Sequence, residues 1–453
     1  MPISALDPAL FALQNRQKLM AKLPENSAVI VLSGAEQIRN RDVEFTFRAE
    51  SDFFYLTAFS EPDSALLLLK NAEQESHLFV RPKDPEQETW QGRRLGVDAA
   101  PNALGVDKAY AIETLDETVL SLLAQTESIY LSFSPLSDLL GSVGDWISAL
   151  KQQGRKGVRA PTQIRDLDAL LHEQRLFKSE EEVQRMRAAA QISVKGHLAA
   201  MQAVQPGRFE YQVQAELEAT FMRHGSPRVA FNSIVAMGEN ACILHYTENR
   251  DEIQDGALVL VDAGAEFKGY AGDITTTFPA NGRFSHPQAQ LYELVLAAQQ
   301  AAIAVIKPGV AYDRAHAASV RVLTEGLLKL GILQGELETL ISEELFKPFF
   351  MHGTGHWLGM DVHDVGDYKQ PINGEQVWRN FEAGMVVTVE PGLYISAEQA
   401  AQLGVDAQWS NIGIRIEDDI LVTESGHEVL TQGLPRTVAE IEAWMQARSK
   451  SHL

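Results

Sequence analysis

Residues 349–364 read FFMHGTGHWLGMDVHD and place three of the chain's 12 histidines between glycines. Glycine lets a backbone turn tightly and approach a bound group closely. Imidazole is a common metal ligand and titrates near neutral pH. The alternative is a buried loop whose histidines are satisfied by hydrogen bonds. The stretch therefore predicts a metal site on the condition that other segments supply further ligands.

Two aspartates upstream are candidates for those ligands. Residues 258–264 read LVLVDAG, an apolar strand that ends in Asp262, and Asp273 follows eleven residues later after further glycines. This spacing predicts a hairpin whose strands bring the two carboxylates together. A carboxylate at the end of a buried strand is costly unless it is paired or bound to metal. In the alternative interpretation each aspartate caps a turn.

Two glutamates repeat the pattern downstream. Residues 385–389 form an apolar strand that ends at Glu390, and Glu417 lies within a β-branched strand predicted at 413–422. The isoleucines of that strand and its glutamate cannot all face one apolar core, because side chains alternate along a strand. A structural salt bridge between Glu417 and Arg415 is the alternative.

Together with His356, these residues make a set of four carboxylates and one imidazole. Carboxylates that converge without a cation repel one another strongly. Two divalent cations would neutralise them, hold a water between them and clamp a carbonyl oxygen. The oxygen-rich set suits a hard ion such as Mn²⁺, although Zn²⁺ and Co²⁺ also accept it.

The overall composition restricts the class of protein. The 453 residues carry a net charge of −22, and this length predicts two or three domains. The acidic balance argues against nucleic acid and anionic membrane as partners, since both require a basic face. Cys242 is the single cysteine, which excludes an intrachain disulfide and a thiolate metal site. No apolar run approaches the roughly 18–20 residues that span a bilayer, and residues 1–24 lack a signal-peptide pattern, so we expect a cytoplasmic protein.

The first part of the chain alternates short apolar runs with amphipathic stretches, a pattern typical of an α/β domain. Ser179 and Glu182 form a capping box that opens a long helix beyond this region. We therefore place the domain boundary at about residue 174. The strands are predicted at 28–34, 53–56, 65–69 and 76–80, and the helices at 8–23, 115–125 and 137–152.

The second part of the chain contains an internal repeat. In each copy a long helix leads through a Pro-Gly pair into a second helix that ends at a glycine, and strand-like segments adjoin both. Such a repeat predicts a pseudo-symmetric α+β domain, and the cleft between its halves is a natural place for a site. The predicted helices are 180–204 and 210–224 around Pro206-Gly207, and 288–305 and 312–330 around Pro308-Gly309.

With these motifs the chain resembles the bacterial Xaa-Pro aminopeptidases (aminopeptidase P) of the pita-bread metallopeptidase family. Residues 89–96, which include Trp90, resemble this branch more than the prolidases. The resemblance implies an α/β N-terminal domain (1–174) for oligomerisation and the pocket rim. It also implies an α+β pita-bread catalytic domain (175–453) with internal pseudo-two-fold symmetry. The other matching motifs are residues 238–246, 262–273, 349–364, 389–392 and 413–418.

The resemblance further implies a centre with two Mn²⁺ ions per subunit, with Zn²⁺ or Co²⁺ as alternatives. Its ligands would be Asp262 on one ion, Asp273 and Glu417 bridging both, and His356 and Glu390 completing the set.

Other site residues follow from the same resemblance. Glu390 would accept a proton from the nucleophilic water, and His363 would contact the scissile carbonyl and stabilise the tetrahedral intermediate. Trp90 would reach the pocket of a neighbouring subunit in a homotetramer. Arg379 is the candidate for a substrate-site arginine, beside a segment, 369–378, that is longer than the family pattern. The remaining residues are His245 and His352 near the substrate, Arg415 and Tyr394 as supports of the site, and Arg155 and Asp42 in the N-terminal domain.

The implied reaction is removal of an N-terminal residue that precedes proline, by a hydroxide that bridges two metals. The expected partners are peptides with proline at the second position and further copies of the chain in a tetramer or dimer. A prolidase, which cleaves only dipeptides, is the alternative within the family, with side activity on organophosphates left open. A metal-free binding protein on the same fold is the alternative of another class, and such a protein would be expected to have lost ligands.

Overall fold

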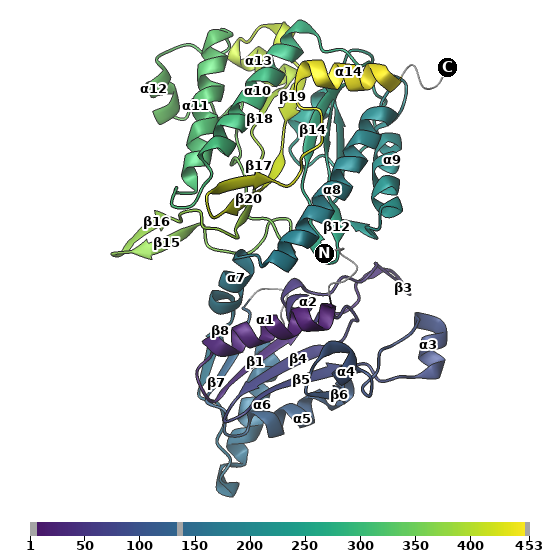
Figure 1. The fold of residues 1–453 in the computed structure, drawn as a ribbon, viewed down its shortest axis with the longest axis vertical. Coiled ribbons are helices and arrows are strands. Elements are labelled where there is room, and N and C mark those ends of the chain that lie inside the picture. Colours follow the sequence, from purple (N-terminus) through teal and green to yellow (C-terminus); the bar gives the residue numbers. More distant parts are fainter. Residues whose placement is uncertain (1–6, 134–138, 449–453) are drawn as a thin grey trace. The chain divides into compact units, whose positions relative to one another are not determined.

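The computed structural model describes residues 7–133 and 139–448. The chain divides into two compact units, Met1–Gln174 and Arg175–Leu453 (Figure 1), and each has its own hydrophobic core. Within the described residues no helix combines the length and the apolar character needed to cross a bilayer.

A six-stranded mixed sheet forms the centre of the N-terminal unit, in the order β6-β5-β4-β1-β7-β8. Strands β5, β4 and β1 are antiparallel, and the other strands join them in parallel. Trp146 packs into the same core cluster as Ile30 and Leu67 of the sheet. The strands are β1 (Ser27–Leu32), β4 (Ala65–Lys70), β5 (Gln74–Val80), β6 (Lys108–Ala111), β7 (Ser128–Leu131) and β8 (Gln163–Asp166), beside a small hairpin of β2 (Ile38–Asn40) and β3 (Val43–Glu44).

The helices of this unit confirm most of the predicted pattern and contradict it once. Residues 53–56, predicted as a strand, lie inside helix α2 (Ser51–Thr57). The Glu50 side chain accepts the Phe53 N–H over 3.0 Å and so caps this helix, and a short apolar run alone cannot distinguish helix from strand. Of the helix predicted at 137–152, residues 137 and 138 lie outside the described residues. The other helices are α1 (Pro8–Lys22), α3 (Pro85–Gln91), α4 (Ala100–Leu104), α5 (Leu115–Leu123), α6 (Leu140–Gln152) and α7 (Asp168–Leu176).

The first half of the C-terminal unit runs from α8 to β14. The Ser179 N–H donates to the Glu182 carboxylate over 2.8 Å at the start of α8, as the capping box predicts. Two helices precede a three-stranded antiparallel sheet in the order β10-β11-β14. The elements are α8 (Glu180–Ala203), α9 (Glu210–Arg223), β9 (Arg228–Val229), β10 (Ile234–Met237), β11 (Leu258–Asp262), β12 (Ala265–Phe267), β13 (Tyr270–Ala271) and β14 (Thr275–Pro279).

The second half, from α10 to β21, repeats two helices and a three-stranded antiparallel sheet, here β17-β20-β21. Gly207 between α8 and α9 and Gly309 between α10 and α11 share a φ of +84°, a conformation that suits glycine. The predicted repeat is therefore confirmed. The elements are α10 (His286–Val305), α11 (Asp313–Lys329), α12 (Leu337–Ser342), β15 (Lys369–Ile372), β16 (Glu375–Trp378), β17 (Val386–Val389), β18 (Gly392–Ile395), α13 (Ala397–Leu403), β19 (Ile412–Arg415), β20 (Asp418–Thr423) and β21 (Gly426–Val429), followed by α14 (Val438–Arg448).

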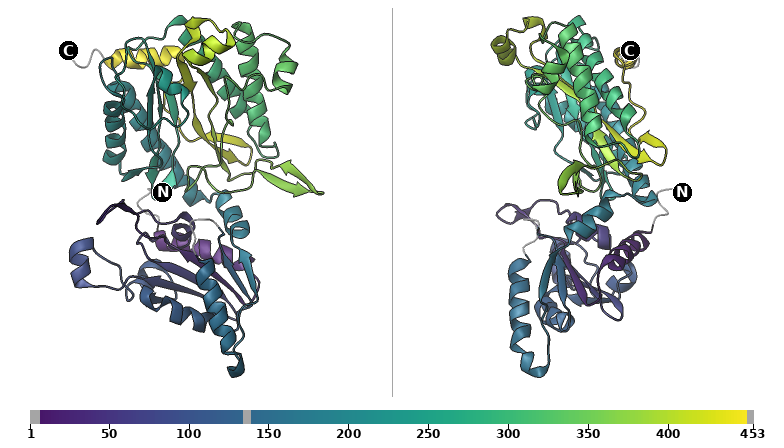
Figure 2. Two further views of the ribbon diagram at one scale, coloured as in Figure 1. Left: turned by 180° about the vertical axis from the view of Figure 1, so that it is seen from behind. Right: turned by 90° about the vertical axis from the view of Figure 1, so that its left-hand side faces the viewer.

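Each half contains a long antiparallel ribbon that is interrupted midway. In the first ribbon β11 pairs with β14 and β12 pairs with β13. In the second ribbon β17 pairs with β20 and β18 pairs with β19. Helices α8 and α10 pack against these strands, and α9 packs against the neighbouring β9 and β10. The helices lie in front of the strands in Figure 1 and behind them in the reverse view of Figure 2.

The interruption of the second ribbon corrects the single strand predicted at 413–422. The chain there forms two strands, because the Glu417 N–H donates to Thr275 O of the first half over 3.0 Å. The register on either side places Glu390 opposite Glu417 and Pro391 opposite Ile416, and Pro391 has no N–H to offer the ladder. The ladder therefore opens at the level of Glu390 and Glu417.

Candidate metal centre

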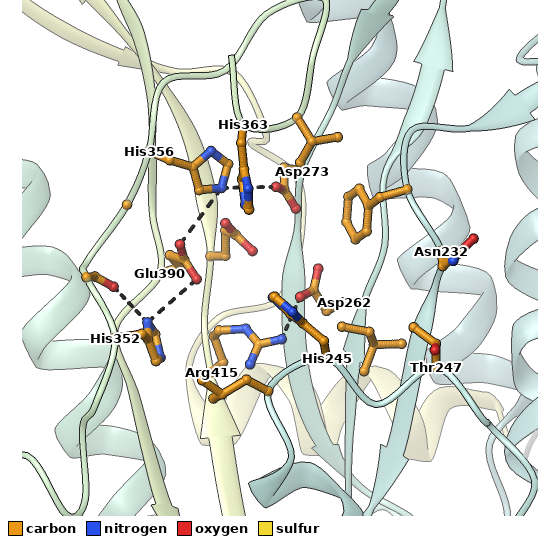
Figure 3. A pocket seen from close by; sticks show the side chains of 17 residues that line it. Asn232, His245, Thr247, Asp262, Asp273, His352, His356, His363, Glu390 and Arg415 are labelled. Carbon is orange, nitrogen blue, oxygen red and sulfur yellow. Dashed lines mark hydrogen bonds and ion pairs between the residues drawn. The ribbon is translucent and has the colours of Figure 1, made fainter. Parts of the chain in front are cut away.

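A cavity of about 530 Å³ opens where the two interrupted ribbons meet. Its polar lining comes from both halves of the C-terminal unit, and Figure 3 shows these side chains pointing into one space. Phe231, Ile234, Leu244 and Val362 line it with apolar groups. The ionisable lining residues are His245, Asp262, Asp273, His352, His356, His363, Glu390, Arg415 and Glu417.

His356 presents one ring nitrogen to the carboxylates. Its Nδ1 lies 3.0 Å from Trp357 O, so the proton is on Nδ1 in the neutral ring and Nε2 is left as a ligand atom. This Nε2 lies 3.5 Å from Asp273 Oδ2 and 3.8 Å from Glu390 Oε1. Both distances exceed a normal hydrogen bond, and they leave room for an ion shared between the groups.

The carboxylates are crowded and buried. Burial first, and then the neighbouring carboxylates, raise the pKa of Asp273 to about 6 and the pKa of Glu390 to about 7. The same causes raise the pKa of Glu417 well above its ordinary value. Burial alone would lower the pKa of His356, but Asp273 and Glu390 raise it to about 9. The cluster therefore strongly attracts positive charge.

The donor set fits divalent cations. Ligand atoms of Asp273, His356 and Glu417 lie within 4.8 Å of one another. Asp262 Oδ1 and Asp273 Oδ1 are buried, and neither has a hydrogen-bond partner in the described part of the chain. Buried carboxylate oxygens in that situation are stabilised by a cation, and oxygen with imidazole nitrogen is a donor set that Mn²⁺ and Zn²⁺ accept.

Arg415 supplies the fixed positive charge of the site. Its Nη2 donates to Asp262 Oδ2 over 2.5 Å, and its Nη1 donates to the Tyr394 hydroxyl over 3.1 Å. The Tyr394 O–H in turn donates to His352 Nε2 over 2.7 Å, while His352 Nδ1–H donates to Gly353 O. Burial, followed by the charge of Arg415, lowers the pKa of His352 to about 3. This histidine is therefore neutral and held in one orientation.

His363 and His245 also line the cavity (Figure 3). The ring centroid of His363 lies 4.3 Å from that of His356, with the rings nearly perpendicular. Burial and the charge of His356 lower the pKa of His363, so its neutral ring keeps one N–H as a donor near neutral pH.

Four of the residues expected at the substrate do not line this cavity. Arg379 is buried elsewhere, with its guanidinium 5.4 Å from the Phe177 ring centroid and 3.5 Å from Glu382. The other three, Trp90, Arg155 and Asp42, belong to the N-terminal unit, where Trp90 is 82% exposed on α3. Tyr394 also lies outside the lining, where it forms hydrogen bonds with Arg415 and His352.

Two supporting groups are absent from the sequence-based expectations. Buried Glu210 accepts from the Tyr246 hydroxyl over 2.8 Å and from the Asp251 N–H over 3.0 Å, and so holds the loop that carries His245. The Thr275 hydroxyl donates to Glu417 over 2.7 Å. The run of three threonines beside Asp273 is a signal for the second group, whereas no local pattern marks Glu210.

Two protein-family models match the chain, one within each compact unit. The model of metallopeptidase family M24 matches residues 184–424, and that of the aminopeptidase P N-terminal domain matches residues 12–130. An Xaa-Pro aminopeptidase of Haemophilus influenzae is 45% identical over 433 residues, which is 95% of this chain and 96% of that protein.

Solved structures are similar over nearly the whole chain. The structure of Pseudomonas aeruginosa aminopeptidase PepP is 47% identical, with a TM-score of 0.94 and coverage of 98% of this chain and 99% of that one. Escherichia coli aminopeptidase P with the inhibitor Pro-Leu is 42% identical, with a TM-score of 0.93 and the same coverage. The fold expected from the sequence is thereby confirmed.

Proposed function

The chain belongs to metallopeptidase family M24, in its Xaa-Pro aminopeptidase branch, and we propose that it hydrolyses the N-terminal Xaa-Pro bond of peptides and releases the first residue. The observation that carries the proposal is the convergence of four carboxylates and one imidazole on a single cavity. The apolar lining beside them suits a proline ring, and the polar lining suits a free amino terminus.

We assign the metal ligands to the groups whose oxygen and nitrogen atoms converge there. Bound divalent cations would neutralise the carboxylates, lower the pKa of water and polarise the scissile carbonyl. Mn²⁺ is our choice for both ions, with Zn²⁺ or Co²⁺ as substitutes. The ligands are Asp262, Asp273, His356, Glu390 and Glu417.

The chain's own residues then move the protons. Glu390 takes a proton from the attacking water, since its carboxylate lines the cavity beside the other proposed ligands. It later passes a proton to the proline nitrogen as the peptide bond breaks. His363 donates a hydrogen bond to the developing oxyanion, an interaction worth about 3 kcal/mol.

The remaining site residues hold the substrate and the ligands in place. His245 and His352 contact the peptide on either side of the cavity, and Arg415 with Tyr394 fixes Asp262 and His352. We further propose that the N-terminal unit, residues 1–174, forms the contacts of a homo-oligomer, a tetramer or a dimer, in the cytoplasm. In this assembly Trp90, Arg155 and Asp42 would complete the pocket rim around the catalytic unit, residues 175–453.

A prolidase is the nearest alternative, and a metal-free binding protein is the more distant one. The second is disfavoured because all five ligand residues are present and converge. A prolidase would require a group that holds the free carboxylate of a dipeptide. Arg379, the arginine expected near the substrate, lies outside the cavity lining.

Metal removal combined with a peptide-length assay tests the proposal. Chelation should abolish hydrolysis and added Mn²⁺ should restore it, while elemental analysis of the restored protein should give two ions per chain. Peptides of the form Xaa-Pro-Xaa-Xaa should be cleaved after the first residue. Full activity of the metal-stripped protein, or cleavage confined to the Xaa-Pro dipeptide, would contradict the proposal.

A further inference from the structure

A buried ionic cluster lies directly behind the His363 loop. The Asp364 carboxylate accepts from Arg175 Nη2 over 2.7 Å and from Lys178 Nζ over 3.0 Å. All three side chains are at most 2% exposed. Arg175 Nη2 also lies 2.8 Å from Asp361 Oδ2, and the Asp364 N–H donates to Trp357 O over 2.9 Å. The loop is thus closed on itself and tied to the start of the C-terminal unit.

The ring of His363 depends on this backbone for its position. Among the residues that the structure describes, none forms a hydrogen bond with the ring, and its recorded contact is the perpendicular packing on His356. The loop has little freedom, since a Cβ on Gly359 would come within 2.0 Å of Asp364 Oδ2. The Gly359 carbonyl also accepts the Ala271 N–H over 2.8 Å, beside the first ribbon.

We propose that Asp364, held by Lys178 and Arg175, is a positioning residue that fixes His363 where it meets the developing oxyanion. The proposal rests on the role given to His363 under the proposed function. Two buried cations shared by one carboxylate resist displacement because moving any member leaves a buried charge unpaired. Misplacement of a catalytic group by about 1 Å is enough to cost up to 10²-fold in rate.

A double-mutant cycle between Lys178→Met and His363→Ala tests this positioning. Lys178→Met removes one cation and leaves Arg175 to neutralise Asp364, so the chain should still fold. We expect its kcat to fall by about tenfold, with KM and metal content unchanged. His363→Ala should lose about 10²–10³-fold, and Lys178→Met added to it should cost nothing more, because the group being positioned is already absent.

Arg187→Met is the matched control. Arg187 is a long cation on α8 that pairs with Glu428 at 2.7 Å, away from the cavity lining, and its loss should leave kcat unchanged. Single-turnover assays with excess enzyme keep the slow variants measurable.

The outcomes separate the positioning role of Asp364 from the role of His363 at the oxyanion. Equal losses from Lys178→Met in both backgrounds, or no loss in the unmodified chain, would overturn the positioning role alone. Full turnover by His363→Ala would overturn that role together with the one assigned to His363.

Discussion

The two ribbons of the C-terminal unit are built alike but hold their carboxylates differently. In the first ribbon, Asp262 at the interruption is ion-paired with Arg415 at 2.5 Å. In the second ribbon, the basic groups within 4 Å of Glu390 are two histidines, His356 at 3.8 Å and His352 at 3.9 Å, within the described part of the chain. The two halves therefore share a backbone arrangement, but different charged groups surround their carboxylates.

The difference lies in the group that holds each carboxylate. Asp262 of the first ribbon is fixed by a guanidinium, whereas Glu390 of the second ribbon faces two imidazoles at longer range. Burial raises the pKa of Glu390 to about 7, and it likewise raises the pKa of Asp273 in the first ribbon to about 6. The contrast between Asp262 and Glu390 is therefore one of contact geometry.

The largest effect is expected from Glu390→Ala, which removes the carboxylate at the interruption of the second ribbon. We expect kcat to fall by about 10²–10⁴-fold, because the variant loses the proton acceptor while the first ribbon stays intact. Circular dichroism should show a folded protein. Turnover within a factor of about ten of the unmodified enzyme would contradict the role given to Glu390, since general-base catalysis accounts for more than that.

Arg415→Met removes the guanidinium that pairs with Asp262 of the first ribbon. It leaves the buried Asp262 without its cation, which should lower the free energy of unfolding of the metal-free protein by about 3–5 kcal/mol. Metal affinity should weaken by about 10–100-fold, since a group that orients a ligand is lost. Denaturant unfolding and metal titration measure these effects, and Arg187→Met is again the control. Unchanged metal affinity would show that Asp262 needs no partner.

His197 of α8 contacts the first ribbon, and it should make the folded protein less stable at acidic pH. This buried ring contacts Thr276 Oγ1 at 2.8 Å and Ala263 O at 2.9 Å, and burial lowers its pKa from 6.5 to about 4. The unfolded chain then binds a proton below pH 6.5 that the folded chain does not bind until about pH 4. The free energy of unfolding should therefore decrease as pH falls from about 6.5 to about 4, by roughly 3 kcal/mol at most.

His197→Gln isolates this contribution from other histidines. Glutamine can still donate and accept hydrogen bonds but does not titrate. Chemical unfolding of both proteins at several pH values should give a shallower decrease for the variant below pH 6.5. Parallel curves would show that His197 does not carry the effect.

The smallest effect is expected from the projecting hairpin of β15 and β16, which the first half lacks. Its strands are largely exposed, with Ile372 at 51% exposure, and none of its residues lines the cavity. Deleting residues 370–377 should change the free energy of unfolding by no more than about 0.5 kcal/mol, and kcat/KM for a tripeptide should stay constant. Reduced cleavage of longer peptides alone would place the hairpin at the substrate. Trp378→Ala should be more costly than the deletion, because Trp378 stacks on Tyr312.

The sequence was most informative where the physical cause is local. The capping box at Ser179 and the Pro-Gly pairs between helices set the boundaries of α8 to α11 because their effects act within a few residues. Short apolar runs were ambiguous, as residues 53–56 show, since strand and helix both bury four such residues. The break at Glu417 was missed because its N–H partner, Thr275, lies in the other half of the unit.

Supporting groups were the hardest to predict. Asp364 contacts Arg175 and Lys178 across 189 and 186 residues, and no periodicity in the sequence connects positions so far apart. Glu210 likewise becomes a support of His245 only after the chain has folded back on it. Residue type and spacing predicted side chains that the fold brings to one cavity, whereas the contacts that hold them emerge from the assembled fold.

The interrupted ribbons also bear on how the protein matures. The Arg415–Asp262 contact spans 153 residues, and contacts of such long range form slowly because a large loop must close first. A nascent chain that has completed only the first ribbon holds its aspartates without either the guanidinium or the glutamates. With the proposed ligand set, high-affinity metal uptake would require the last strands, and metal loading would then report completed folding.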